Sequence, residues 1–109
     1  MLGHGFLEKV YEKALMIELR NRGLGVENQV PLKVIYKEEI IGEYFADLLV
    51  EGKVIVEIKA VKHLLKEHQA QLLNYLKATG IQVGLMVNFT KSKAEIKRMV
   101  FDLPEGQRE

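Results

Sequence analysis

The centre of the chain carries the run Val54-Ile55-Val56-Glu57-Ile58-Lys59-Ala60-Val61. A run this apolar predicts a strand that is covered on both faces inside a sheet. Two charged residues interrupt it, and because side chains alternate along a strand, Glu57 and Lys59 share one face. Burying an unpaired carboxylate is strongly unfavourable. Glu57 is therefore expected to have a cation partner, either a lysine or a metal ion.

The preceding segment, Tyr44–Val50, repeats this pattern with one carboxylate, Asp47, among apolar residues. A turn centred on Gly52 predicts an antiparallel hairpin that sets Asp47 directly opposite Glu57. Opposed side chains have Cβ atoms about 5 Å apart, so two like charges repel unless a cation lies between them. Oxygen ligands of this kind suit magnesium. The alternative is a half-exposed hairpin whose carboxylates border solvent, with Lys59 as a surface counterion worth under about 1 kcal/mol.

Helical periodicity lies on both sides of this hairpin. Apolar residues recur with a helical period from Phe6 to Arg22, and Gly23 ends the segment. A second helix is predicted from Lys66 to Thr79, with Gly80 as its stop. Short β-branched stretches between the helices predict an antiparallel meander of strands over Gly25–Val30, Leu32–Tyr36, Ile40–Val50 and Val54–Lys59.

Two further segments follow the second helix. Gln82–Val87 has the composition of a buried strand. Ala94–Phe101 fits a helix, because a capping-box pattern precedes it, and also an alternating strand, which we favour. This order of elements predicts an α/β domain of the α+β type, with a mixed central sheet flanked by helices. One domain is expected over residues 1–102, followed by a flexible tail over residues 103–109.

Composition restricts the possible functions. The 16 basic and 15 acidic residues nearly cancel, so any site for a polyanion must be local. The chain has no cysteine, which excludes disulfides, thiolate zinc sites and cysteine nucleophiles, and the expected compartment is cytoplasmic. No apolar run approaches the roughly 20 residues of a membrane span, and the start lacks the features of a signal peptide. No membrane association is expected.

Several motifs carry a family resemblance. Asp47 followed by Glu57-Ile58-Lys59 resembles the motif of the PD-(D/E)XK nuclease superfamily. More narrowly, the spacing in Gly5–Tyr11 resembles the GxxExxY family, as do Gly42–Asp47 and Ala70–Leu76. The resemblance covers nearly the whole chain, which looks short at its N-terminus beside that family. It implies an αβββαβ restriction-endonuclease-like core that hydrolyses phosphodiester bonds in nucleic acid, with DNA favoured over RNA.

The resemblance also implies roles for single residues. Asp47, Glu57 and the backbone carbonyl of Ile58 would bind Mg²⁺ or Mn²⁺, and such a metal lowers the pKa of bound water and neutralises phosphoryl charge. Lys59 would orient the attacking water or stabilise developing charge. Glu8 lies at the end of the apolar stripe of the first helix and could bring a carboxylate to the metal. The alternative for Glu8 is an ordinary first-turn glutamate favoured by the helix dipole.

The second helix contributes two further candidates. Gln71 and Tyr75 are one turn apart and resemble the Gln-x-x-x-Tyr element of RecB-like nucleases, which arranges the active site or contacts nucleic acid. The alternative is a core tyrosine with its hydroxyl at the rim. Four residues after the lysine strand could steer a phosphate backbone, but a solvated helix entry explains them equally well: Lys62, His63, Lys66 and His68.

Two other functions are consistent with the sequence. One is a non-catalytic binding or assembly module that retains the nuclease fold, as a homodimer or an accessory subunit. Its motivation is the small size, the balanced charge and the lack of a separate recognition domain. The other is structural metal binding without hydrolysis, which would couple magnesium to stability alone.

Overall fold

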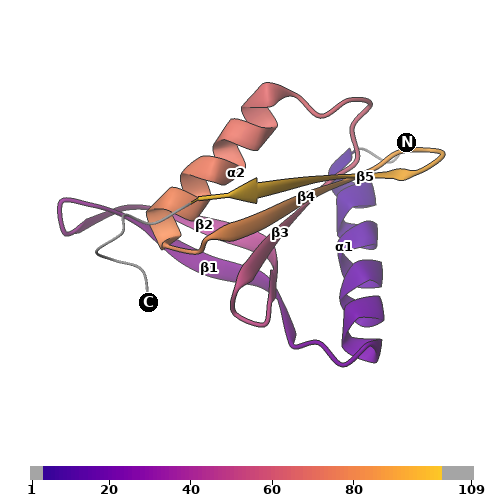
Figure 1. Ribbon diagram of the computed structural model, residues 1–109, viewed down its shortest axis with the longest axis horizontal. Helices are drawn as coiled ribbons and strands as arrows, with labels where there is room; N and C mark the ends of the chain where they lie inside the picture. The colour runs from indigo at the N-terminus through magenta and orange to yellow at the C-terminus, as the bar shows by residue number, and fades with distance from the viewer. Residues whose placement is uncertain (1–3, 102–109) are drawn as a thin grey trace.

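The structure is a computed structural model that describes residues 4–101. Its elements are α1 (His4–Asn21), β1 (Val26–Tyr36), β2 (Glu39–Val50), β3 (Val54–Lys59), α2 (Lys66–Thr79), β4 (Val83–Phe89) and β5 (Ala94–Val100). The strands form one sheet in the order β1-β2-β3-β4-β5, in which only β3 and β4 are parallel (Figure 1). This confirms the predicted α+β fold with a mixed sheet. The predicted tail over residues 103–109 lies outside the described residues.

The two helices pack on opposite faces of the sheet (Figure 1). On one face, Leu72 and Leu76 of α2 pack with Ile55 and Met86 of the central strands. On the other face, the apolar stripe of α1 packs on Val56, Ile58 and Val87, as its helical period predicts; its members are Tyr11, Leu15, Met16 and Leu19. Each helix therefore covers its own hydrophobic core.

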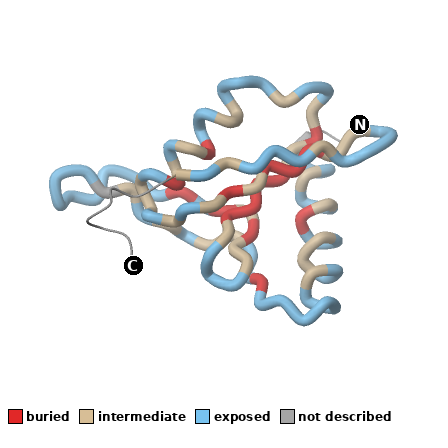
Figure 2. The backbone as a smooth tube through the Cα atoms, viewed as in Figure 1, coloured by how far each residue is buried: buried red, intermediate tan, exposed pale blue. Residues whose placement is uncertain are grey.

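The buried residues concentrate in the middle of the sheet (Figure 2). β3 is buried at four consecutive positions, from Ile55 to Ile58, which confirms a central strand covered on both faces. Gly80 caps the C-terminus of α2: it has φ +77°, and its N–H donates to the carbonyl of Leu76 at 2.9 Å. None of the helices within residues 4–101 has the length and hydropathy to span a membrane.

The pairing of the strands in the sheet decides two of the predictions about strands. The expected separate strands Gly25–Val30 and Leu32–Tyr36 are one strand, β1, in which Pro31 pairs with Phe45. β1 lies at the edge of the sheet, where proline is tolerated because one side of the backbone needs no partner. The ambiguous segment Ala94–Phe101 forms strand β5 over Ala94–Val100, and its pairing with β4 confirms the favoured prediction.

In both β1 and β2, the alternating side chains switch from one face of the sheet to the other part-way along the strand. Leu48 packs in the core beneath α1, whereas Ala46 packs in the core beneath α2, although residues two apart on a regular strand share a face. β1 changes in the same place, where Gln29 has the unusual φ of +48°. The residue between Ala46 and Leu48 is Asp47. We call this exchange at Gln29 and Asp47 the face reversal.

The contact between β4 and α2 is tight at Gly84. A Cβ placed on Gly84 would lie 3.1 Å from three atoms of the buried Leu72 side chain. Gly84→Val is therefore expected to destabilise the protein by about 1–3 kcal/mol through overpacking, measured by urea unfolding. The matched control is Gly42→Val on β2, where a Cβ meets nothing within 4 Å. Equal stabilities of the two variants would contradict this packing.

Candidate active site

The site begins where β2 and β3 part. Their antiparallel ladder ends with Leu48 opposite Val56, so Asp47 and Glu57 do not form the predicted cross-strand ladder pair. Instead, the Asp47 carboxylate reaches into the gap, and its Oδ2 accepts the N–H of Ile58 at 2.8 Å. The N–H of Asp47 points to Oε1 of Glu57 at 3.5 Å. The two acids are neighbours, held by side-chain contacts to the opposite backbone.

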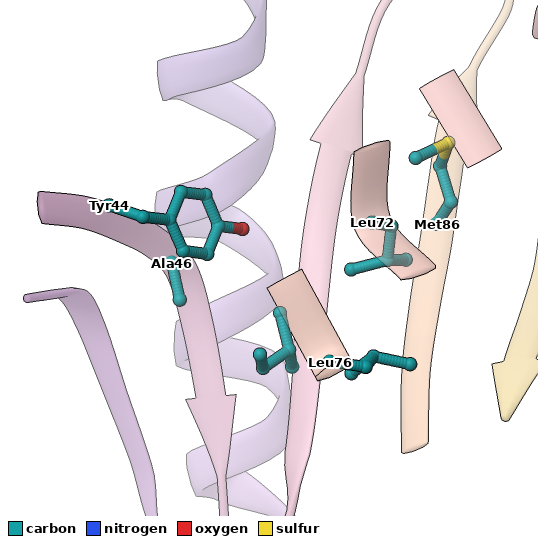
Figure 3. Packing of buried hydrophobic residues seen from close by; sticks show 6 residues of the cluster. Tyr44, Ala46, Leu72, Leu76 and Met86 are labelled. Carbon is teal, nitrogen blue, oxygen red and sulfur yellow. The ribbon is translucent and has the colours of Figure 1, made fainter. Parts of the chain in front are cut away.

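Glu57 is the most deeply buried of the predicted charged site residues, with 9% of its surface exposed. Its Oε1 accepts a hydrogen bond from the hydroxyl of Tyr44 on β2. In Figure 3 the Tyr44 hydroxyl is directed away from β2 toward the neighbouring strand. A buried carboxylate held in this way has one fixed orientation, which is what a ligand or base at an active site requires.

The surroundings of Glu57 disfavour the negative charge of its carboxylate. Burial raises its pKa from 4.5 to about 7, and this is the largest influence. The N–H of Asp47 and the ammonium of Lys59 lower the pKa, whereas the charges of Glu12 and Glu8 raise it further. Within the described residues, no salt bridge joins Glu57 to a cationic side chain. The lysine nearby thus compensates only part of the cost of the buried charge.

The two candidates on α2 reach this carboxylate through Tyr44. The ring of Tyr75 stacks on the ring of Tyr44, with centroids 3.4 Å apart and planes 14° from parallel. Gln71 Nε2 donates to the hydroxyl of Tyr75 at 3.0 Å. The Gln-x-x-x-Tyr pair therefore continues as a line of contacts from α2, over Tyr44, to Glu57.

Glu8 lies against the far end of the site. Its Oε2 accepts the N–H of Ala60 at 3.2 Å, directly after Lys59 at the end of β3. This contact places the carboxylate of α1 beside the strand that carries Glu57 and Lys59. Lys59 itself is half-buried. Every residue of the predicted set thus lies on β2, β3 or a helix face in contact with them.

A sequence model of the PD-(D/E)XK nuclease superfamily matches residues 1–99, which include the whole of this site. The chain belongs to the PD-(D/E)XK nuclease superfamily. Among solved structures, the crystal structure of SSO0001 is similar, with a TM-score of 0.70 and 19% sequence identity over 94% of this chain. That likeness shows the shared fold, and the chain spans about half of SSO0001, 54% of its length. No curated protein matches the chain significantly.

PD-(D/E)XK nucleases typically use divalent metals, and the donors of this site suit such ions. Asp47, Glu57 and the carbonyl of Ile58 offer hard oxygen donors of the kind that Mg²⁺ and Mn²⁺ bind. The raised pKa of Glu57 marks a buried carboxylate whose charge a cation would stabilise. Across residues 4–101, however, no three or more histidine, aspartate or glutamate side chains converge on one metal position. The donors fit by chemistry, with water and phosphate oxygens needed to complete a coordination shell.

Three residues in contact with the candidate site were not predicted from the sequence: Glu12, Gln29 and Tyr44. Glu12 is 3% exposed and accepts a hydrogen bond from Gln29 Nε2 at 2.7 Å. The same Nε2 lies 3.4 Å from Oδ1 of Asp47, so the amide joins two carboxylates. Glu12 follows Glu8 by one helical turn, which was an available signal. Nothing in the sequence around Gln29 distinguishes it.

Proposed function

We propose that this protein is a metal-dependent nuclease of the GxxExxY family that hydrolyses phosphodiester bonds, with DNA proposed ahead of RNA. The proposal rests on one observation above all: Asp47 and Glu57 meet where β2 and β3 part, and Lys59 continues the same strand. Membership of the PD-(D/E)XK superfamily supports phosphodiester hydrolysis at such a cluster. We assign the activity to a single domain over residues 1–102.

In this proposal the acids hold the metal. Asp47, Glu57 and the carbonyl of Ile58 bind Mg²⁺ or Mn²⁺, and Glu8 supplies a further carboxylate at the α1 side. When bound, the metal supplies an acidified water and neutralises charge on the phosphoryl oxygens. The chain contributes orientation: Asp47 is fixed by the N–H of Ile58 at 2.8 Å, and Glu8 by the N–H of Ala60 at 3.2 Å.

Lys59 is the proposed electrostatic catalyst. Its ammonium offers three N–H donors that orient the attacking water or stabilise the negative charge that develops on the phosphoryl group. Gln71 and Tyr75 act as positioning residues, because their contacts run through Tyr44 to Glu57. They would keep the Glu57 carboxylate in the orientation that metal binding needs.

A catalytically silent binding or assembly module, as a homodimer or an accessory subunit, is the second candidate. It is favoured by one observation: the acidic side chains within residues 4–101 do not converge as a preformed metal shell. In such a module Glu57 would be about half protonated near pH 7, since burial raises its pKa to about 7. Hydrogen bonding to Tyr44 would then be its whole role.

Cleavage and metal-binding assays separate the two candidates. The purified protein is incubated with single- and double-stranded DNA and with RNA, in Mg²⁺, in Mn²⁺ and in chelator. We expect DNA cleavage that requires the metal and stops with the chelator. An Asp47→Asn preparation made in the same way controls for contaminating nuclease. Absence of cleavage on every substrate, together with no heat of Mg²⁺ binding in calorimetry, would establish the silent module instead.

A further inference from the structure

A groove of about 470 Å³ lies beside the proposed site, and Ala60 is the one residue of its lining that has a role assigned above. It is formed by the first turns of α1, by residues 60–62 after β3, and by residues 89–92 at the β4–β5 turn. These three segments come together at one end of the molecule (Figure 1). The groove starts at Ala60, the residue directly after Lys59, and the Ala60 N–H is the one bound by Glu8.

Aromatic rings form the wall of the groove. Tyr11 of α1 stacks on Phe89 of β4, with ring centroids 4.3 Å apart and planes 10° from parallel. Both side chains are partly exposed. A stacked pair at an open surface offers a platform onto which another flat ring can stack.

The rim of the groove is basic. Lys62 and Lys91 line it from different segments, and both are exposed to solvent. Thr90 and Ser92 belong to the same lining, and none of the lining residues is acidic. In a chain whose net charge is only +1, this places a local positive field around an aromatic wall.

We propose that this groove binds an unpaired nucleotide of a single-stranded nucleic acid. The base stacks beside Tyr11 and Phe89, and Lys62 and Lys91 contact the flanking phosphates, a combination of aromatic and basic groups suited to single strands. The volume of about 470 Å³ lies in the range of small-ligand sites. This inference rests on the proposed nuclease function, and it names the substrate class: a single strand or a frayed end rather than an intact duplex.

The position of the groove links binding to cleavage. A strand seated there would reach the end of β3, because Ala60 lines the groove and directly follows Lys59. The groove lies on the α1 side of the sheet, whereas Glu57 shares the α2 side with Tyr44, so the strand would have to pass around the end of β3 to bring a phosphodiester to Glu57 and Lys59. A duplex holds its bases stacked and paired, so it cannot offer a base to the groove without first opening.

The test measures binding in chelator, where metal-dependent cleavage is blocked. Fluorescence anisotropy is recorded with labelled oligothymidine and with a matched strand that carries abasic sites. Phe89→Leu keeps an apolar side chain but removes the aromatic face, and is expected to weaken oligothymidine binding about 5- to 100-fold. The abasic strand should bind weakly to wild type and should not distinguish the two proteins.

A second variant tests the basic rim without touching the core. In Lys62→Ala/Lys91→Ala, the slope of log affinity against log salt should become shallower by about 0.7 for each phosphate that a lysine no longer neutralises. Lys53→Ala, on the exposed turn between β2 and β3, is the matched control and should leave the slope unchanged. Circular dichroism and urea unfolding verify that each variant is folded.

The outcomes keep this inference separate from the proposed function. Equal affinity of wild type for thymidine and abasic strands, or an unchanged salt slope in the double lysine variant, would overturn the groove assignment. If both variants cleave duplex DNA at the wild-type rate, the proposed nuclease function stands. The assignment of the groove as a binding site for the substrate strand is then wrong. Loss of oligothymidine binding in both variants, in a protein that cleaves nothing, would support the groove and reject catalysis.

Discussion

Replacing Lys59 by alanine is expected to lower the rate of metal-dependent DNA cleavage by about 10²–10³-fold, the cost of removing one electrostatic group from the developing charge. The rate is measured in single-turnover assays with saturating protein, so that weaker substrate binding does not enter. Lys97→Ala is the matched control, because Lys97 is an exposed lysine of β5 in the same sheet. A Lys59→Ala protein that cleaves at the wild-type rate would remove Lys59 from the mechanism.

Asp47→Asn provides the companion test for the metal. Asparagine keeps an oxygen that accepts the N–H of Ile58, but it loses the negative charge. We expect cleavage to fall at least about 100-fold with little change in stability, because the charge-dependent part of metal binding is lost while the hydrogen bond persists. Retained cleavage in Asp47→Asn, or equal Mg²⁺ affinity by calorimetry, would contradict the assignment of Asp47 as a metal ligand.

The second large effect concerns stability. Glu57→Gln is expected to stabilise the metal-free protein at pH 8 by about 1–3 kcal/mol, because one pKa unit corresponds to about 1.4 kcal/mol and the pKa of Glu57 is raised from 4.5 to about 7. Glutamine has nearly the same shape and still accepts the hydroxyl of Tyr44. It removes only the buried charge that the surrounding groups compensate incompletely.

The pH dependence follows from the sign of this shift. Because the folded pKa lies above the unfolded value, the folded state binds the proton more tightly, and protonation of Glu57 favours folding. The favourable contribution is complete below about pH 4.5 and is lost as the pH rises through about 7. Urea unfolding in chelator should therefore show the advantage of Glu57→Gln growing from pH 4.5 to pH 8.

Added Mg²⁺ is expected to reverse the order of stability of wild type and Glu57→Gln. The metal should raise the midpoint of thermal unfolding of wild type at pH 8, since a ligand that binds only the folded state stabilises it. The same addition should leave Glu57→Gln nearly unchanged. The matched control is Glu95→Gln on β5, which should respond to Mg²⁺ as wild type does. A glutamine variant at position 57 that is less stable than wild type in chelator at pH 8 would contradict the electrostatic account of Glu57.

The elements of the fold could be predicted because each leaves a local pattern. The stripe of α1, the glycine after α2 and the unbroken apolar run of β3 each match the structure. The pairing of Leu48 with Val56 also follows from a turn at Gly52. The continuity of β1 through Pro31 could not be predicted, because whether proline interrupts a strand depends on whether that strand lies at an edge.

The candidate site could be predicted only in part, for a related reason. Asp47, Glu57 and Lys59 are charged residues in apolar surroundings, and that contrast is visible in a sequence. Tyr44 is an aromatic residue in a strand, and its bond to Glu57 depends on a contact between two strands. Gln29 meets Asp47 and Glu12 through tertiary structure alone. Partners that look ordinary in their own segments leave no signal.

The face reversal at Gln29 and Asp47 bears on how accurately the hairpin of β1 and β2 can form. In a regular hairpin, a slip of two residues keeps every side chain on its own face, so apolar patterning alone does not forbid it. Here a slip of two residues would move Gln29 and Asp47, the positions where the side chains switch faces, out of alignment with each other. Core residues of one strand would then point toward solvent. The pairing is thereby fixed to a single alignment, and the same residue that locks it carries the proposed catalytic carboxylate.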